Sequence, residues 1–424
     1  MKQLLSLSVS AVVLGVLCSA RPSLAGTSDA LVLQWNEIAV QAVGATAPFP
    51  STRAMATVQV AVFEAANAIT REYTPYLGTV NAPDGASADA AVVAAAHDTL
   101  LWLFPGQQSL LDGKQAESLA AIPDGPAKDD GMAAGRAAAA AMIANRTGDG
   151  SAPAQFYTPA SDASYQWQPT PSCANAPANN RGLFFHWQFV KPFGIDSSAQ
   201  FRAQQPPALV SGRYTHDFEE VKAVGDATST ERPPDRADVA TLYAAQPPHR
   251  GWNLVARQIA AARNDDVTTT ARTLAIMNMS LSDAHITVFA SKYFYRTWRP
   301  ETAIRRADED GNRFTSPDLD YRPFIVTPCF PSYPSAHGAG GGAARAVLER
   351  AYGRKGHDLT ITDPGAPGIV LHYSDLRDIT DDVSDARVYG GIHFRFDQDA
   401  ADKMGADIGR YNDDHLLLPL GAED

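Results

Sequence analysis

The sequence lacks three features that would point to common classes of protein. Only 3 of its 424 residues are cysteine, too few for a fold held together mainly by disulfide bonds. Lys and Arg number 35 against 47 Asp and Glu, and the net charge of -12 argues against a nucleic-acid partner. After residue 25 no apolar stretch approaches the roughly 18 residues of a membrane span. We therefore expect neither nucleic-acid binding nor a membrane span.

The first 25 residues have the pattern of a secretory signal. Lys2 precedes an apolar stretch rich in Leu and Val, which ends in small residues at 23–25. Cys18 raises the alternative of a lipoprotein, but the preceding Leu17 is bulkier than a lipid-modification site requires. We predict that residues 1–25 are a signal peptide and that the protein is exported, either to a periplasm or out of the cell.

Two cysteines remain after this segment, Cys173 and Cys329. An oxidising compartment would allow them to pair. Two buried free thiols are an equally good interpretation, because the sequence does not give the distance between their Cα atoms. The sequence leaves the disulfide open.

Apolar residues recur at spacings of three and four along most of the chain, which predicts amphipathic helices separated by turns rich in Gly, Pro and Asp. The predicted helices span residues 29–43, 53–69, 86–104, 107–121, 130–145, 217–224, 238–245, 251–262 and 268–298. The pattern lapses between 151 and about 211, where many aromatic side chains indicate an ordered loop rather than a linker.

This pattern predicts an all-α fold of packed helical bundles. We expect an N-terminal helical region, residues 26–210, which includes the long aromatic-rich loop. It would brace a C-terminal helical region, residues 211–424, and the two would share a continuous core. About 400 residues are enough to bury a core of this size.

Three short segments in the last 140 residues carry the chemistry, and the first contains two cations. Arg299 follows Lys292 by seven positions, which on a helix is about two turns, so both would lie on one face. Two such side chains can close on one anion. Pro300 disfavours helical geometry at the residue before it and so predicts the end of the helix at Arg299.

The second segment combines an anion site with a histidine. A helix-compatible series, Gly338 to Leu348, follows Ser335 closely, so Ser335 lies where a helix begins, and free backbone N–H groups and a hydroxyl at a helix start bind anions. His337 could exchange a proton with a bound oxyanion. The glycines that follow are not a nucleotide-binding loop, because no Gly-Lys-Ser/Thr sequence accompanies them.

The third segment contains Arg387, His393 and Asp397. On a helix, a carboxylate four residues after a histidine can accept a hydrogen bond from one imidazole nitrogen and leave the other with a free lone pair. Such an imidazole can act as a nucleophile or as a ligand to the central atom of an oxyanion. Arg387 adds a planar, bidentate donor for the oxygens.

Taken in this order, the three segments resemble the superfamily of type 2 phosphatidic acid phosphatases and vanadium-dependent haloperoxidases. Its pattern is Lys-x6-Arg-Pro, Pro-Ser-Gly-His and Ser-Arg-x5-His-x3-Asp, and this chain departs from it at two positions. Ala336 replaces the Gly and can still offer its backbone N–H. Ala386 replaces the Ser before Arg387. The helical N-terminal half is also similar to that of soluble bacterial haloperoxidase-like proteins.

The resemblance implies a role for each site residue. Lys292, Arg299 and Arg387 would neutralise the oxygens of a bound vanadate or phosphate, while Ser335 and the Ala336 N–H donate hydrogen bonds. His393 would bind the central atom, as the ligand of the metal in vanadate or as the nucleophile that becomes a phosphohistidine. His337 would move protons and Asp397 would orient His393.

The oxyanion site alone does not separate the two activities, because phosphate and vanadate have nearly the same shape. Phe330 lies where chloride-oxidising relatives carry Phe and suits a dry halide pathway, whereas Phe289 lies where they carry Trp or Arg. We favour a vanadium-dependent haloperoxidase, an oxidoreductase with vanadate as cofactor and hydrogen peroxide and halide as substrates.

Two other functions are weighed against the haloperoxidase. The alternative is an exported acid phosphatase that acts on a phosphate ester without vanadate. A third interpretation, a non-catalytic phosphate-binding protein, is disfavoured by the retention of both histidines and all three cations. The other histidines show no metal-ligand spacing. We expect no zinc site and no loss of turnover on changing His285.

Overall fold

The computed structural model describes residues 29–44, 47–175 and 177–421, which fold as packed helices. The predicted signal segment lies outside these residues. The N-terminal helices are α1 (Ala30–Val43), α2 (Pro48–Thr70), α3 (Ala88–Leu103), α4 (Gln108–Ala120) and α5 (Pro126–Arg146). The later helices are α6 (Gly212–Gly225), α7 (Pro234–Ala245), α8 (Pro248–Arg263), α9 (Val267–Tyr295), α10 (Pro300–Arg305), α11 (Ala336–Tyr352), α12 (Leu376–Val388) and α13 (Arg395–His415). Four short 3-10 helices complete the set: η1 (Pro105–Gln107), η2 (Pro171–Ala174), η3 (Phe185–Phe189) and η4 (Ala307–Glu309).

The all-α prediction is confirmed, with one small addition. A two-stranded antiparallel hairpin, β1 (Lys355–Ile361) and β2 (Leu371–Asp375), follows α11. Its inward side chains Leu359 and Ile361 are buried, and Gln258 of α8 exchanges two hydrogen bonds with the backbone of Thr360. The helical periodicity gave no signal for this hairpin, because each strand is only a few residues long.

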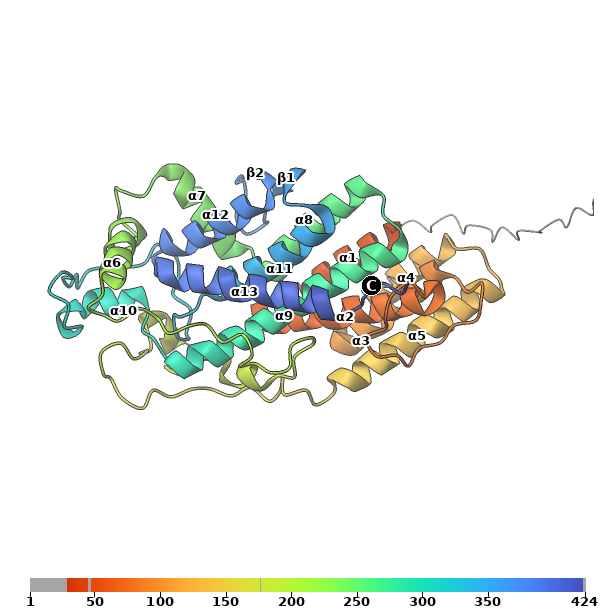
Figure 1. Cartoon of the computed structure of the whole chain (residues 1–424), viewed down its shortest axis with the longest axis horizontal. Helices are drawn as coiled ribbons and strands as arrows, with labels where there is room; N and C mark the ends of the chain where they lie inside the picture. Colours follow the sequence, from red (N-terminus) through yellow and green to blue (C-terminus); the bar gives the residue numbers. More distant parts are fainter. Residues whose placement is uncertain (1–28, 45–46, 176, 422–424) are drawn as a thin grey trace, which may run out of the picture.

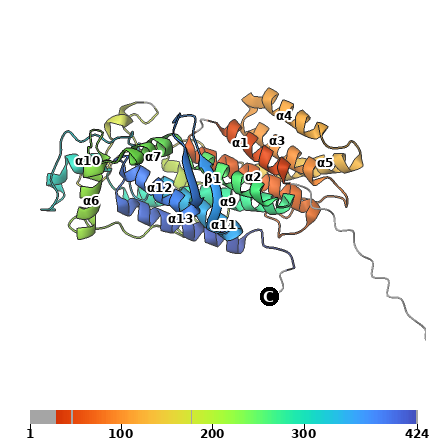
Figure 2. The same cartoon turned by 90° about the horizontal axis from the view of Figure 1, so that it is seen from above.

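Helix α9 connects the two ends of the molecule. It runs from the α1–α5 group towards α10, and it packs on α2 on one side and on α11 and α13 on the other (Figure 1). One hydrophobic cluster includes Val58 of α2, Leu274 of α9 and Ile379 of α12, so the core is continuous between the two regions. A second cluster surrounds the C-terminal half of α9. The view from above shows α4 and α5 at the end opposite to α6 and α10 (Figure 2).

Several helix boundaries differ from those predicted, and two of them have a clear local cause. Helix α2 begins at Pro48 rather than at 53, because a proline in the first turn lacks only an N–H that has no intrahelical acceptor. Helix α9 ends at Tyr295, since Arg296 adopts a left-handed conformation with φ of 55°. None of the helices in the described part of the chain is both long and apolar enough to cross a membrane.

The long loop before α6 is ordered, as predicted, and it packs beside the segment that carries Phe330. A disulfide joins Cys173 to Cys329 and settles the question that the sequence left open. The Leu183 N–H donates to the Cys329 carbonyl, and the Trp167 N–H donates to the Arg296 carbonyl. The loop is thereby tied both to the turn that follows α9 and to the segment that carries Phe330.

Helices α11 and α13 approach so closely that their backbones touch. A Cβ atom added at Gly405 of α13 would lie 2.0 Å from the carbonyl oxygen of Ala339, and one at Gly342 of α11 would lie 2.4 Å from that of Asp402. Neither carbonyl can move without breaking its own helix. The glycines therefore set the distance between the two helices.

Gly405→Ala is expected to lower the free energy of unfolding by about 3 kcal/mol, because the helices must separate to admit the methyl group. Gly113→Ala is the matched control. Gly113 lies in α4 with open space around it, so there alanine should stabilise the helix by roughly 0.5–1 kcal/mol. Urea unfolding measures both. Equal changes in the two variants would contradict the close packing.

Candidate active site

The centre of the candidate site is His393, held by Asp397. The His393 Nδ1 lies 2.7 Å from Asp397 Oδ2, and its Nε2 lies 3.0 Å from Arg299 Nη1. A guanidinium has only donors, so Nε2 must be the acceptor and Nδ1 must carry the proton. Burial, followed by the positive charges of Arg299 and Lys292, lowers the pKa of His393 well below its usual range. The ring is therefore neutral, with a lone pair at Nε2.

Asp397 is fixed by more than its histidine. Its Oδ2 also accepts from the Ser332 hydroxyl at 2.6 Å and from the Phe394 N–H at 3.2 Å. Burial raises the pKa of Asp397 to about 6, although the Ser332 hydrogen bond and the nearby cations lower it. The sequence analysis missed Ser332, because a serine outside the three motifs gives no signal.

All three predicted cations are buried in the site, and neutral carbonyl groups hold them. Lys292 donates to the carbonyl oxygens of Pro331 at 2.8 Å and Ser332 at 2.6 Å. Arg299 donates to those of Phe330 at 2.9 Å and Ile392 at 3.0 Å, and Arg387 donates to that of Tyr243 at 3.2 Å. Within the described residues, none of the three forms an ion pair with a carboxylate.

The Asp397 carboxylate balances only part of the positive charge of this cluster. Burial lowers the pKa of Lys292 well below its usual range, that of Arg299 to about 9 and that of Arg387 to about 10. Arg299 Nη2 and Arg387 Nε are buried donors without an acceptor in the described residues. Buried cations need an anion or a full set of acceptors. This donor set fits a tetrahedral oxyanion such as vanadate or phosphate.

The start of α11 supplies the second predicted segment. Ser335 caps the helix by accepting from the Gly338 N–H at 3.3 Å, which leaves its hydroxyl proton for another acceptor. The first-turn N–H groups, that of Ala336 included, have no intrahelical acceptor. The Ser335 N–H donates to the Asp397 carbonyl at 3.0 Å and so joins this helix start to the His393 segment.

His337 follows in the first turn of α11. Its ring is only partly buried, and it lines a small cavity on the side of α7, α8 and α12. Burial, followed by the positive charge of Arg387, lowers the pKa of His337 well below its usual range. His337 is therefore neutral and able to accept a proton.

Two predictions of local structure were wrong. Arg299 does not share a helix with Lys292: the chain turns at Arg296, and Arg299 is the extended residue before α10, which starts at Pro300. His393 does not lie on a helix with Asp397. It precedes α13, in which Asp397 occupies the first turn. In both cases a sharp turn still brings together the side chains that the motif indicates.

His285 lies closer to the site than the sequence analysis expected. It is fully buried, its Nε2 lies 3.2 Å from the Ala336 carbonyl oxygen, and its Nδ1 lies 3.1 Å from the Thr52 hydroxyl. Gly340 makes room for the ring, since a Cβ there would lie 3.0 Å from Nε2. His285 thus supports the start of α11. A variant at this position is therefore not a suitable control for the expectation that turnover stays unchanged.

An aromatic wall covers the side of the site that faces the long loop. Phe330 packs edge-on against the rings of Phe49, Phe184 and Phe289. The Arg299 guanidinium lies 5.0 Å from the centre of the Phe330 ring, and the Lys292 ammonium 5.2 Å from it. Phe330 and Phe289 therefore belong to one dry wall beside the cations.

Comparison with known proteins finds similar sequences and folds. Residues 272–418 match the family described as the VCPO second helical-bundle domain. Over 282 residues, 51% of its length, the chain is 25% identical to the vanadium chloroperoxidase of Curvularia inaequalis, and it spans about half of that relative, 46%.

Solved structures show the same fold. The chain is similar to a structure described as the first bacterial vanadium-dependent iodoperoxidase, with a TM-score of 0.78, 23% identity and coverage of 93% of this chain and 98% of the other. A holo-type bacterial vanadium-dependent chloroperoxidase gives a TM-score of 0.69 at 17% identity, with coverage of 92% and 96%. Together with the match over residues 272–418, these similarities show that the chain has the fold of the bacterial vanadium-dependent haloperoxidases.

Proposed function

We propose that this protein is a vanadium-dependent haloperoxidase that oxidises halide with hydrogen peroxide. The observation that carries the proposal is the group of three buried cations, none of them ion-paired with a carboxylate in the described residues, around an unprotonated His393 Nε2. The relatives named above are chloro- and iodoperoxidases, which supports the oxidoreductase class. We also propose that the protein is exported, either to a periplasm or out of the cell.

In this proposal each residue has a defined task. His393 Nε2 would be the ligand of the metal, and Asp397 holds the ring with that nitrogen unprotonated. Lys292, Arg299 and Arg387 neutralise the oxygens of the anion, and Ser335 and the Ala336 N–H donate to them. Bound vanadate supplies the activation of peroxide towards attack by halide.

His337 handles protons at the same place. Because its pKa is lowered, it is unprotonated at neutral pH and available to accept a proton from an incoming peroxide, and it gives that proton up readily afterwards. Peroxide reduction consumes two electrons from the halide and releases water, so a nearby base and acid are needed in turn. His337 is the histidine whose ring opens to the adjacent cavity.

The first prediction separates this function from that of a phosphatase. Mature protein loaded with vanadate should halogenate a dye in the presence of peroxide and bromide. His393→Ala should reduce the rate at least a thousandfold, whereas His372→Ala, at an exposed position on β2, should leave it unchanged. A dye-bromination assay measures the rate.

Release of phosphate from an aryl phosphate by vanadate-free protein, without bromination by the loaded protein, would establish the phosphatase instead. If both activities are absent and phosphate still binds, the protein is a phosphate-binding protein. Circular dichroism of His393→Ala checks that the fold is intact.

The second prediction concerns the buried charge itself. Arg387→Met should raise the free energy of unfolding of the anion-free protein, because desolvating a charge costs several kcal/mol and the lost hydrogen bond to Tyr243 contributes only about 1 kcal/mol. The same change should weaken vanadate binding at least tenfold, as expected from the loss of a charge-assisted hydrogen bond. Thermal unfolding with and without vanadate measures both effects.

Arg377→Met on the same helix is the control, since Arg377 is exposed and pairs with Asp381. It should change neither quantity appreciably. If Arg387→Met destabilises the anion-free protein and leaves the vanadate-induced shift of Tm intact, the guanidinium is structural and the assignment of the cation cluster is wrong.

A further inference from the structure

Phe184, in the long loop before α6, has an unusual backbone conformation. Its φ of 60° and ψ of 29° lie in the left-handed region, which is rare for a residue with a bulky side chain. Such a conformation persists only where the surrounding contacts enforce it, and it is found most often at functional sites. The contacts around Phe184 therefore indicate what its position serves.

The residue before Phe184 is fixed at both of its backbone groups. The Leu183 N–H donates to the Cys329 carbonyl at 2.8 Å, and the Leu183 carbonyl accepts from the Tyr293 hydroxyl. Both partners belong to segments that build the site, because Cys329 directly precedes Phe330 and Tyr293 lies in the last turn of α9. The position of Phe184 is thus set from the site itself.

The ring of Phe184 covers the aromatic wall beside the cations. Its centre lies 4.9 Å from that of Phe49, 5.6 Å from that of Phe289 and 6.4 Å from that of Phe330. The three rings beneath it are at most 7% exposed, whereas Phe184 itself is partly exposed. Phe184 is therefore the member of this group that lies between the wall and solvent.

Only one ring separates Phe184 from the buried cations. The Phe330 ring that it contacts lies 5.0 Å from the Arg299 guanidinium and 5.2 Å from the Lys292 ammonium. An organic group carried by a bound anion and directed towards this wall must displace one of the rings. Phe184 is the ring with solvent behind it, so it decides whether such a group is accommodated.

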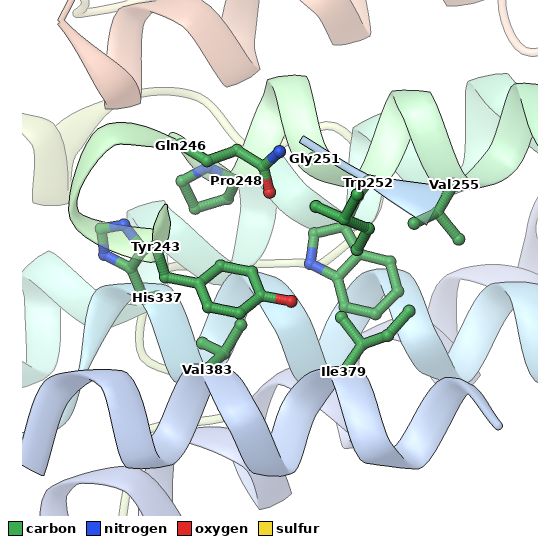
Figure 3. A pocket seen from close by; sticks show the side chains of 10 residues that line it. Tyr243, Gln246, Pro248, Gly251, Trp252, Val255, His337, Ile379 and Val383 are labelled. Carbon is green, nitrogen blue, oxygen red and sulfur yellow. The ribbon is translucent and has the colours of Figure 1, made fainter. Parts of the chain in front are cut away.

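The His337 side of the site gives no room for a large group either. His337 lines a cavity of about 20 Å³, enough for a molecule the size of water. Trp252 and Pro248 of α8 and Val383 of α12 are among the residues around it (Figure 3). Because packed helices supply most of this wall, the movement of one side chain does not enlarge it to the size of a phenyl group.

We propose that Phe184 is a specificity-determining residue of the oxyanion site, whose ring limits the size of the organic group that a bound oxyanion can carry. The proposal rests on the oxyanion site of the proposed function, and it names the class of anion accepted there, an inorganic oxyanion rather than an ester. The φ and ψ angles of a residue set the direction in which its side chain leaves the backbone. The left-handed conformation is what places this ring over the wall.

The test compares methylphosphonate with phenylphosphonate, two probes that share a head group, on vanadate-free protein. The rise in Tm over a series of probe concentrations gives each Kd. The unchanged protein should bind methylphosphonate about tenfold more tightly than phenylphosphonate, as expected when atoms are inserted into a packed wall. Phe184→Ala should bind phenylphosphonate about tenfold more tightly than the unchanged protein does, and its Kd for methylphosphonate should change by less than about twofold.

Phe189→Ala is the matched control. Phe189 lies in the same loop, is 62% exposed and contacts the ring of Phe185 rather than the wall. Its loss should change neither Kd. Adding Arg387→Met to Phe184→Ala should weaken the binding of both probes, because both need the cations. A gain for phenylphosphonate that persists in this double variant would place the probe outside the site and would overturn the proposal.

Phe184→Gly keeps the test valid if Phe184→Ala folds poorly. Glycine adopts the left-handed conformation without a steric penalty, so this variant should have a higher Tm than Phe184→Ala, although both lack the ring. Its gain in affinity for phenylphosphonate should match that of Phe184→Ala. Circular dichroism of both variants shows whether the helices are retained.

Failure of this proposal can be told from failure of the proposed function, because binding is measured without turnover. If the unchanged protein binds both phosphonates equally, or if neither variant gains affinity for phenylphosphonate, Phe184 does not set the size limit, whatever reaction the protein catalyses. If the vanadate-loaded protein does not brominate while the phosphonates bind as expected, the haloperoxidase is refuted and the role of Phe184 stands.

Discussion

The structure depends on three cations that the protein buries without neutralising them. Carbonyl oxygens fix Lys292, Arg299 and Arg387 in position, while the nearby carboxylate of Asp397 is engaged by His393 and Ser332. Carbonyl groups orient a cation but leave its charge available. A carboxylate in their place would hold the same side chains and would compete with the anion. The unpaired cations therefore favour binding of an anion and lower the stability of the fold. Other parts of the fold must offset this loss of stability.

Helix termini contribute part of the stabilisation of these buried charges. Lys292 lies in the last turn of α9 and Arg387 in the last turn of α12, where the partial negative charge of a helix favours a cation. Asp397 lies in the first turn of α13, where the partial charge has the opposite sign. Lys292, Arg387 and Asp397 thus sit at helix ends that stabilise them, by up to roughly 2 kcal/mol in a partly buried setting. Arg299, at the start of α10, has no such support. The C-terminal ends of α9 and α12 and the N-terminal ends of α11 and α13 meet at the site.

The sequence was sufficient for the composition of the site and insufficient for its local geometry. Motif spacing identified Lys292, Arg387 and His393 as parts of one cluster, because their side-chain chemistry is specific and rare in combination. Helical spacing placed Arg299 wrongly on α9, since the left-handed turn at Arg296 carries no glycine or proline that would reveal it. Periodicity gave the helices from α1 to α9 to within a few residues, because most of them bury a long apolar face.

Other features could not be predicted because they depend on contacts between distant segments. His285 contacts the Ala336 carbonyl, 51 residues further along the chain, and Trp252 packs beside Gly341, 89 residues further along. No local pattern in the sequence marks either residue. Pairing of Cys173 with Cys329 required the distance between two loops. The hairpin after α11 is held by Gln258 of α8, which precedes it by about 100 residues. Long-range packing decides each of these.

The close contact between α11 and α13 also determines where this protein can vary. Gly342 and Gly405 admit no larger residue, so the spacing between the Ser335 end of one helix and the Asp397 end of the other is locked by main-chain atoms rather than by side chains. Substitutions elsewhere cannot easily disturb it. The walls contributed by α7, α8 and α12 carry no such restriction, and they offer the freer ground for altering which substrate is accepted, in evolution or in the laboratory.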